Sequence, residues 1–330
     1  MNIIFKNVGQ GDSIIVELNR DDGFNTGIID CHKLKGENPV IQHLVDNEVE
    51  KILFIILSHP HYDHYSGLLE LLEFCEQKNI HIKRFAHTAN HHISYMQWYE
   101  LEANKVALLE QIFLKIDALY RVGLIQHIGN VTQDWQIQLD DHHQLKCLSP
   151  SDHEIRRYYK QAKFLQDTDR LKCSQAANLL STVFKIEQEN DFILLTSDAE
   201  KTTFQRLHDT CMDDYFSGEL RLCQIPHHGA LANHHPQFWS DLKRKPNCPA
   251  AISVGEHKRY KHPHVQVVER FEEMKYRIYS TNYIQSSYDF DKVNDKLSLA
   301  LSTHNPLIEQ YHIEADQIFT FTEGRVQEVV

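Results

Sequence analysis

Four potential metal ligands lie close together in the segment Ser58–Gly67. They are His59, His61, Asp63 and His64, spaced as H-x-H-x-D-H. Imidazole nitrogens and carboxylate oxygens are ligands that suit zinc, manganese or iron. The spacing predicts a site for a divalent cation, and we regard a polar loop that carries these histidines by coincidence as the weaker interpretation.

Two later segments offer further ligands, each after an apolar run that predicts a buried strand. Asp198 follows DFILLTS, and His227 and His228 follow RLCQIP. A carboxylate can bridge the two cations of a two-metal hydrolase, which makes Asp198 a candidate bridge. Taken alone, Asp198 could equally be the N-cap of the next helix, and His227 could be an ordinary loop histidine. Their order and their place after strands favour ligands. The histidine pairs at 91–92, 142–143 and 234–235 lack this context, so we expect them on the surface.

The elements expected around these residues alternate between strands and helices. KILFIILS (51–58) is a continuous apolar run, typical of a strand buried on both faces, and it ends at His59. An amphipathic helix is expected over 66–79, with its N-terminus toward the loop, which would favour an anionic substrate. Open α/β sheets place their sites at the carboxyl ends of strands. The pattern therefore predicts a layered α/β protein.

Composition limits the function classes further. The chain has 330 residues, 42% of them hydrophobic and 24% charged, with no apolar run long enough for a membrane span and no signal-peptide pattern. The seven cysteines are scattered without a C-x-x-C pair, which indicates a reducing cytoplasm and no thiolate zinc site. A net charge of −12 means that contact with nucleic acid would need a local basic patch or bound metal.

H-x-H-x-D-H is the signature of the metallo-β-lactamase superfamily, and the rest of the chain resembles its ComEC-like branch, including the stand-alone hydrolases. The resemblance covers most of residues 3–281. Its motifs are V8-G-Q-G-D-S13, Ile29-Asp30, Leu57–His64, Asn178 before an apolar strand, S197-D-A-E200 with Ser in place of the usual Gly, Pro226–Gly229, Ile252–Gly255 and Arg259–His264. It implies a single four-layer αββα sandwich over residues 1–330. Outside it lie a helical insertion at about 90–125 and a C-terminal extension at about 285–330. The insertion could be a lid or the interface of a homodimer.

The resemblance also implies a role for each ligand. The first metal would be held by His59 and His61, the second by Asp63, His64 and His227, and Asp198 would bridge them. Asn178 stands where many members supply a further histidine to the first metal, and Asn is the weaker ligand. His228 would orient a neighbouring ligand. Asp30 would likewise lie behind the ligands and orient one of them. Asp12 either holds a ligand histidine from beneath or only stabilises its own turn.

The segment His257–His264 is the best candidate for contact with substrate. It gathers the following side chains in an otherwise acidic chain: Lys258, Arg259, Lys261, His262 and His264. A bidentate Arg would fit a phosphate oxygen, and His262 and His264 would serve beside a departing alkoxide. The alternative is a solvated basic turn before a helix.

The function expected is hydrolysis by a metal-bound hydroxide, with Asp63 as proton acceptor and two divalent ions, zinc or manganese, as cofactors. We favour a phosphodiesterase or nuclease acting on nucleic acid or a nucleotide-derived substrate, without membrane association. The runner-up is a carboxyl-ester, lactone or amide hydrolase that uses the same site. A third hypothesis is a non-catalytic binding module with a degenerate site, which the intact motifs disfavour.

Overall fold

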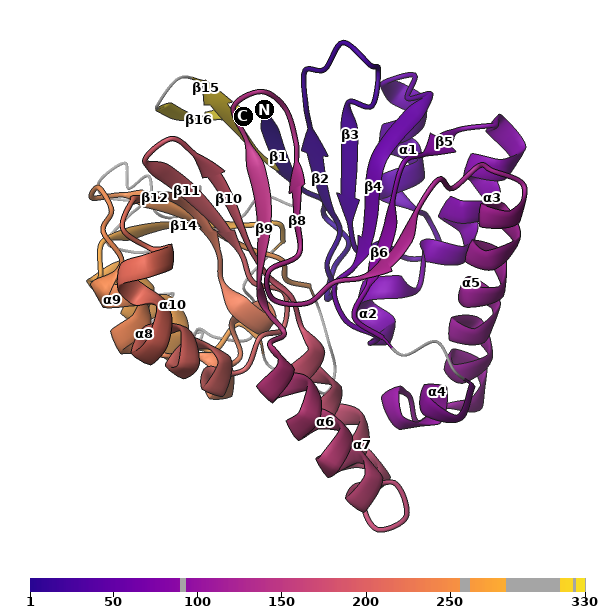
Figure 1. Ribbon diagram of the computed structural model, residues 1–330. Coiled ribbons are helices and arrows are strands. Elements are labelled where there is room, and N and C mark those ends of the chain that lie inside the picture. Colours follow the sequence, from indigo (N-terminus) through magenta and orange to yellow (C-terminus); the bar gives the residue numbers. More distant parts are fainter. Residues whose placement is uncertain (90–92, 256–261, 283–314, 323–324, 330) are drawn as a thin grey trace.

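Two β-sheets lie face to face, and helices cover the outer face of each (Figure 1). The computed structural model describes residues 1–89, 93–255, 262–282, 315–322 and 325–329. The first sheet consists, in spatial order, of β16 (Arg325–Val329), β15 (Gln317–Thr322), β1 (Asn2–Phe5), β2 (Ile14–Glu17), β3 (Thr26–Ile29), β4 (Lys51–Leu57), β6 (Phe85–His87) and β7 (Ile128–Asn130), with β5 (His81–Ile82) paired to β4.

The second sheet is built from the second half of the chain. In spatial order it consists of β14 (Tyr276–Ser280), β13 (Cys248–Ile252), β12 (Glu219–Gln224), β11 (Asp191–Leu195), β10 (Val183–Gln188), β9 (Gln144–Ser149) and β8 (Gln136–Gln138). Strands β11 to β14 run parallel to one another, as do β3 and β4 in the first sheet. Open α/β sheets place their sites at the carboxyl ends of such parallel strands.

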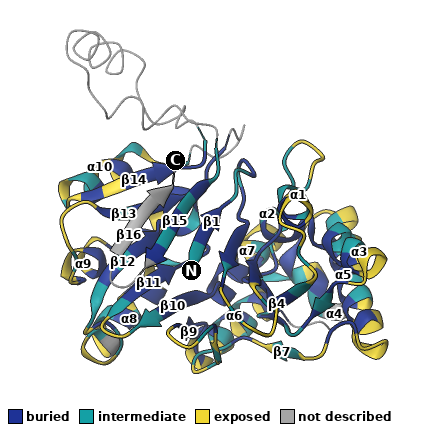
Figure 2. Cartoon of the chain, turned by 90° about the horizontal axis from the view of Figure 1, so that it is seen from above, coloured by how far each residue is buried: buried dark blue, intermediate teal, exposed yellow. Residues whose placement is uncertain are grey.

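The helices form the two outer layers, so the four-layer αββα sandwich is confirmed. Against the first sheet lie α1 (Pro39–Asp46), α3 (Leu68–Lys78) and α5 (Ala103–Arg121), and against the second lie α8 (Lys201–Tyr215), α9 (Pro236–Asp241) and α10 (Val265–Glu273). Figure 2 shows the strands mostly buried and the outer helix faces exposed. Among the described helices, none combines the length and apolar composition that crossing a bilayer requires.

Strand β4 shows why this order of layers forms. Ile52, Ile55 and Leu57 pack into the core beneath α1, α3 and α5, whereas Leu53 and Ile56 pack into the core between the two sheets. Both faces of the strand are therefore buried, as the continuous apolar run predicted.

The helical stretch at 93–122 is part of the outer layer. It forms α4 (Ile93–Tyr99) and α5, which connect β6 to the parallel strand β7. Leu109, Ile112 and Ile116 of α5 are buried in the same core as α3. The segment is thus the crossover between two parallel strands, and α5 has its apolar face already covered.

The C-terminal tail completes the first sheet. Strand β15 pairs antiparallel with β1, with Asn2 opposite Thr320, and β16 follows it as a hairpin. Phe319 is fully buried between the sheets and meets the ring of Phe5 edge-on at 6.0 Å. Residues 315–322 therefore contribute to the central core.

Candidate metal centre

The H-x-H-x-D-H loop leaves the carboxyl end of β4 and is tied to the end of β3 by Asp30. The Ser58 backbone N–H donates to Asp30 Oδ1 at 2.7 Å, and the Ser58 hydroxyl donates to Oδ2 at 2.6 Å. The same Oδ2 lies 2.7 Å from His64 Nδ1. One buried carboxylate thus fixes both the start and the end of the loop.

The residues from the second sheet arrive at the ends of β11 and β12. The side chain of Gln224, the last residue of β12, accepts a hydrogen bond from the Ser197 backbone N–H at 2.9 Å and donates to Asp12 Oδ2 at 2.9 Å. The His227 backbone N–H donates to the Ser197 carbonyl at 2.9 Å. These bonds hold the turn that carries Asp198 against the histidine turn and against the loop between β1 and β2.

Several of these turns use backbone conformations that L-residues rarely adopt. Asp30, Ser197, His227 and His228 all have positive φ, between 45° and 62°. Each such residue costs about 1–3 kcal/mol and persists only where its surroundings hold it in place. Ser197 stands where the resemblance has Gly, and its hydroxyl lies 3.2 Å from His59 Nδ1, a contact that Gly could not make. Strain concentrated in this way is typical of functional sites.

One group of ligand atoms gathers around Asp198 Oδ2. His59 Nε2 lies 3.6 Å from this oxygen and 3.1 Å from His61 Nδ1. His227 Nε2 lies 3.3 Å from the same oxygen. His59, His61 and Asp198 form a compact cluster that could hold a cation.

A second group gathers around the other oxygen of Asp198. His64 Nε2 lies 3.5 Å and His228 Nε2 lies 3.7 Å from Asp198 Oδ1, and His228 Nε2 lies 3.7 Å from Asp63 Oδ2. Asp12 belongs to this cluster too, with Oδ2 at 4.0 Å from His64 Nδ1. One carboxylate therefore faces both groups, one oxygen to each.

The outer nitrogens of the histidine rings are held by fixed acceptors. His61 Nε2 lies 2.9 Å from the Ser174 carbonyl, and His228 Nδ1 lies 2.9 Å from the Ser253 carbonyl. The Asp30 carboxylate described above holds His64 in the same manner. A ring nitrogen that donates outward leaves the other with a lone pair that points into the site, which is how metal-binding histidines are oriented.

The inner atoms fit a cation. His64 Nε2, Asp198 Oδ1 and His228 Nε2 are all buried and have no hydrogen-bond partner. Buried polar atoms are normally paired, so these three require a partner of another kind. Metal bonds of about 2.0–2.1 Å at tetrahedral angles place ligand atoms about 3.4 Å apart. The observed 3.5 and 3.7 Å separations agree with that spacing.

The charge on the cluster is also suitable. Burial opposes ionisation of Asp198, but the neighbouring rings of His227, His64 and His228 outweigh it and hold the pKa of Asp198 well below its usual range. Burial likewise opposes ionisation of Asp63, and the neighbouring His228 and His64 rings outweigh it and keep the pKa of that carboxyl low. Both carboxylates are ionised at neutral pH and present negative charge to a cation.

The rings of the two adjacent histidines face different oxygens of Asp198. His228, expected only to orient a neighbour, is the ring that faces Asp63 and Asp198 Oδ1, whereas His227 faces Asp198 Oδ2. The two successive left-handed residues turn the rings in different directions, with 79° between their planes. Asn178 contacts the His227 ring, with its amide nitrogen 3.5 Å from Nδ1.

The residues expected to contact substrate are only partly placed. Lys258, Arg259 and Lys261 lie outside the described residues. His262 is half-buried with its ring centroid 5.8 Å from that of His227, and burial, helped by neighbouring histidines, lowers the pKa of His262 to about 4. His264 is exposed, precedes α10 and contacts the ring of His262 instead of the ligands.

Several residues of the site were not predicted from the sequence. His32 borders Asp63: a Cβ on Gly11 would come within 2.5 Å of both the Asp63 carbonyl and the His32 ring. Gln224 and Ser174 hold ligands through the bonds given above. His32 lies two residues after Asp30, at a strand end, which is the one signal in the sequence that could have singled it out.

The expectation that the other histidine pairs lie on the surface was wrong for three residues. His143, His234 and His235 are buried. His143 Nδ1 lies 2.7 Å from Asp140 Oδ1, and His235 Nε2 lies 2.7 Å from Gln205 Oε1. Hydrogen bonds to neighbouring groups therefore accompany the burial of His143 and His235, whereas the ring of His234 packs against Phe271. His91 and His92 lie outside the described residues.

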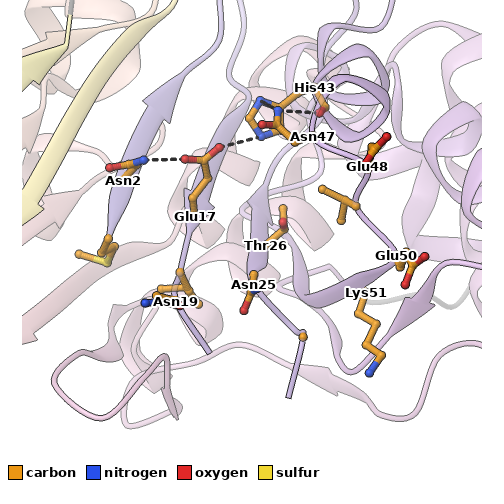
Figure 3. Close-up of a pocket in the computed structure, with 14 residues that line it drawn as sticks. Asn2, Glu17, Asn19, Asn25, Thr26, His43, Asn47, Glu48, Glu50 and Lys51 are labelled. Carbon is orange, nitrogen blue, oxygen red and sulfur yellow. Dashed lines mark hydrogen bonds and ion pairs between the residues drawn. The ribbon is translucent and has the colours of Figure 1, made fainter. Parts of the chain in front are cut away.

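The cavity shown in Figure 3 is separate from the cluster. It has a volume of about 440 Å³ and lies around the start of β4, at Lys51, whereas the cluster lies beyond the other end of that strand. Glu17 is its central carboxylate, and both oxygens are engaged, one by Asn2 Nδ2 at 2.7 Å and one by His43 Nε2 at 3.2 Å. The cavity thus offers no free carboxylate at its centre.

Comparison with known proteins identifies the region around the loop. Residues 36–143 match the family model of the metallo-beta-lactamase superfamily, a match that supports membership of that superfamily. No curated protein matches the sequence significantly.

Three solved structures show a distant likeness. The metallo-beta-lactamase fold protein YhfI from Bacillus subtilis is 11% identical, with a TM-score of 0.45 over 85% of this chain and 96% of that one. Zn(2+)-bound PqqB from Methylobacterium extorquens is 9% identical, with a TM-score of 0.46 over 85% and 98%. A diphosphatase from the PhnP family is 13% identical, with a TM-score of 0.41 over 85% and 94%. At these TM-scores none of the three informs the substrate.

Proposed function

We propose that this chain belongs to the metallo-beta-lactamase superfamily, whose model matches residues 36–143, and that it is a metal-dependent phosphodiesterase acting on nucleic acid or a nucleotide-derived substrate. One observation carries the proposal. Ligand groups from both sheets converge on the buried Asp198, and each of its oxygens faces a different group. A carboxylate shared in this way is the arrangement of two-metal hydrolases, a class that includes phosphatases and nucleases.

The distances, together with the resemblance, support two ligand sets. His59, His61 and His227 would hold one cation with Asp198 Oδ2, and we assign no direct bond to Asn178. Asp63, His64 and His228 would hold the other with Asp198 Oδ1. These nitrogen and oxygen donors suit zinc or manganese. Two such cations, when bound, activate water and neutralise the charge that develops on the substrate.

The chain's own side chains have distinct tasks around this centre. The Asp63 side chain is 35% exposed, compared with 2% for Asp198, so Asp63 is the carboxylate that water and substrate can reach. We assign proton acceptance to Asp63 Oδ2. His262, neutral at pH 7, lies beside the partly exposed His227 ring and offers a ring N–H to a phosphate oxygen.

The choice of phosphodiesters over carboxyl esters has two supports. A pair of cations suits an in-line displacement at phosphorus, because it can stabilise the attacking and the leaving oxygen together. The second support is positive charge that would suit a phosphate. The basic residues Lys258, Arg259 and Lys261 follow Gly255 in the sequence, and Gly255 packs against the Gly9 loop. We further propose a cytoplasmic location, since six described cysteines are all free and buried.

The proposal is tested by stripping the purified protein with a chelator and reloading it with Mn²⁺ or Zn²⁺ separately. Bis-p-nitrophenyl phosphate, cyclic dinucleotides, single-stranded DNA and lactones form the substrate panel. We expect no turnover without metal and recovery on phosphodiesters with one of the two ions. Recovery on lactones alone would favour the carboxyl-ester alternative. Failure to take up metal would favour a non-catalytic binding module.

A positioning role for Asp30 gives a separate prediction. Asp30→Asn keeps the shape of the side chain but weakens the hydrogen bond to His64 Nδ1, so metal affinity should fall by about 10–100-fold while the fold is retained. Calorimetric titration of metal into stripped protein measures this effect. Asp46→Asn, on the exposed side of α1, is the matched control. Equal affinities of the two variants would rule out the role.

A further inference from the structure

Helices α6 (Asp152–Leu165) and α7 (Arg170–Gln175) form a hairpin that projects from the body on the side where α2 (Tyr62–Tyr65) lies (Figure 1). One face of the hairpin is anchored. The Tyr158 ring stacks on Tyr99 with centroids 5.8 Å apart, and Trp98 Nε1 donates to Gln166 Oε1 at 2.7 Å. The hairpin is therefore a fixed arm whose opposite face is open to solvent.

The open face of α6 is basic. Arg156, Lys160 and Lys163 are exposed and follow the i, i+4, i+7 spacing that places side chains in one row along a helix. Arg156 lies 3.6 Å from Asp152, but both side chains are more than 80% exposed, so this pair contributes little. Among the described residues, no carboxylate lies within 4.0 Å of Lys160 or Lys163. The row is thus a local positive strip on a chain of net charge −12.

An aromatic ring stands at the end of this row. The side chain of Phe164 follows Lys163 directly and is 73% exposed. The row from Arg156 to Lys163 rises about 10 Å along the helix axis. Binding sites for single strands combine cations for the phosphates with exposed rings on which bases stack, and α6 presents both kinds of group.

The base of the arm reaches the metal centre. The Ser174 carbonyl in α7 lies 2.9 Å from His61 Nε2, and the Ser174 hydroxyl donates to the Tyr99 carbonyl at 2.6 Å. The chain continues from α7 into the turn that carries Asn178, beside His227. The base of the arm is therefore adjacent to the candidate site.

We propose that α6 is a docking arm for single-stranded nucleic acid, with phosphates on the row Arg156, Lys160 and Lys163 and a base stacked on Phe164. The inference rests on the proposed phosphodiesterase function and specifies its substrate class. A single strand is favoured over a duplex because stacking on Phe164 needs an unpaired base. The overall negative charge also opposes extended contact with a duplex.

Binding is measured by fluorescence anisotropy with metal-loaded protein and a labelled phosphorothioate oligothymidylate, which resists hydrolysis. For Lys160→Glu/Lys163→Glu we expect a Kd at least about 10-fold higher and a salt dependence lower by about 1.4 log units per decade, the loss of two phosphate contacts. For Phe164→Ala we expect a Kd about 10-fold higher. Turnover of bis-p-nitrophenyl phosphate should stay at the wild-type level, because this small substrate does not reach the arm.

Matched controls lie on helices α3 and α5. Lys78→Glu/Arg121→Glu removes two exposed cations, and Leu114→Ala removes an apolar side chain that is 69% exposed. These controls should bind the oligonucleotide like the wild type.

Wild-type Kd and salt dependence in the α6 variants would overturn the docking arm and leave the phosphodiesterase proposal intact. Loss of bis-p-nitrophenyl phosphate turnover in the same variants would also overturn it, because α6 would then be supporting the site. Preference of the wild type for anionic vesicles over the oligonucleotide would refute a nucleic-acid arm. A different result would contradict the phosphodiesterase proposal, namely that the wild-type protein hydrolyses no phosphodiester.

Discussion

Replacing Asp198 by asparagine is expected to lower turnover of phosphodiesters by about 10³-fold, the upper end of the loss caused by removing one electrostatic stabiliser of a reaction. The reason is that a single buried carboxylate faces both ligand groups, with Oδ2 3.3 Å from His227 Nε2 and Oδ1 3.5 Å from His64 Nε2. The amide carries no charge and offers only one oxygen. Bound metal, measured by mass spectrometry of the purified protein, should fall together with turnover.

The control for this change lies on the same strand. Asp191 begins β11 and pairs with Arg221 at 2.8 Å, far from the cluster at the strand's other end. Asp191→Asn should keep both the metal content and the turnover. If Asp198→Asn retained full metal content and activity, the shared-carboxylate account would be wrong.

The second large effect is expected at His228. His228→Gln should lower turnover by about 10²–10³-fold and remove about one equivalent of metal, because this ring faces Asp63 and Asp198 Oδ1. Its Nδ1 lies 2.9 Å from the Ser253 carbonyl, and the side chain is 2% exposed, so the ring is held firmly in this position.

The neighbouring residue gives the comparison. His227 is 24% exposed, and its Nδ1 has only a 3.5 Å contact with the Asn178 amide. Because the His227 ring is held less firmly, its loss should reduce turnover less. We expect His227→Gln to lower turnover by about 10-fold. His142 is exposed, and His142→Gln should leave turnover unchanged. A larger loss at His227 than at His228 would restore the assignment that the sequence suggested.

This pair of histidines shows where sequence reasoning ends. The loop His59–His64 and the positions of Asp198, His227 and His228 were predictable, because each follows an apolar run that had to become a strand buried on both faces. Which of two adjacent rings points to which oxygen depends on two consecutive positive-φ residues. No periodic pattern encodes that turn, so the sequence could not predict that the His228 ring faces Asp63 and the His227 ring the other oxygen of Asp198.

The pairing of strands far apart in the sequence could not be predicted either. The tail strand β15 joins β1 with Asn2 opposite Thr320, a contact between the two ends of the chain that no local signal announces. Gln224 is a similar case: it is one polar residue at the end of an apolar strand, yet its side chain connects Ser197 to Asp12. The sequence predicts which elements exist, whereas the packing of the sheets decides which polar side chains meet.

For the helical stretch at 93–122, the sequence predicted the secondary structure but left its role open. Its periodicity correctly predicted helix, but the sequence left a lid and a dimer interface open. In the structure, Leu109, Ile112 and Ile116 of α5 are buried against the core of the first sheet. That face of α5 is therefore covered within the chain, while Leu114 on the same helix is 69% exposed.

Anomalous diffraction from crystals of the metal-loaded protein tests the central claim most directly. The account predicts two peaks, one bounded by His59, His61 and Asp198 Oδ2 and the other by Asp63, His64, His228 and Asp198 Oδ1. A single peak that does not touch Asp198, or no metal among these side chains in protein that turns over substrate, would contradict it.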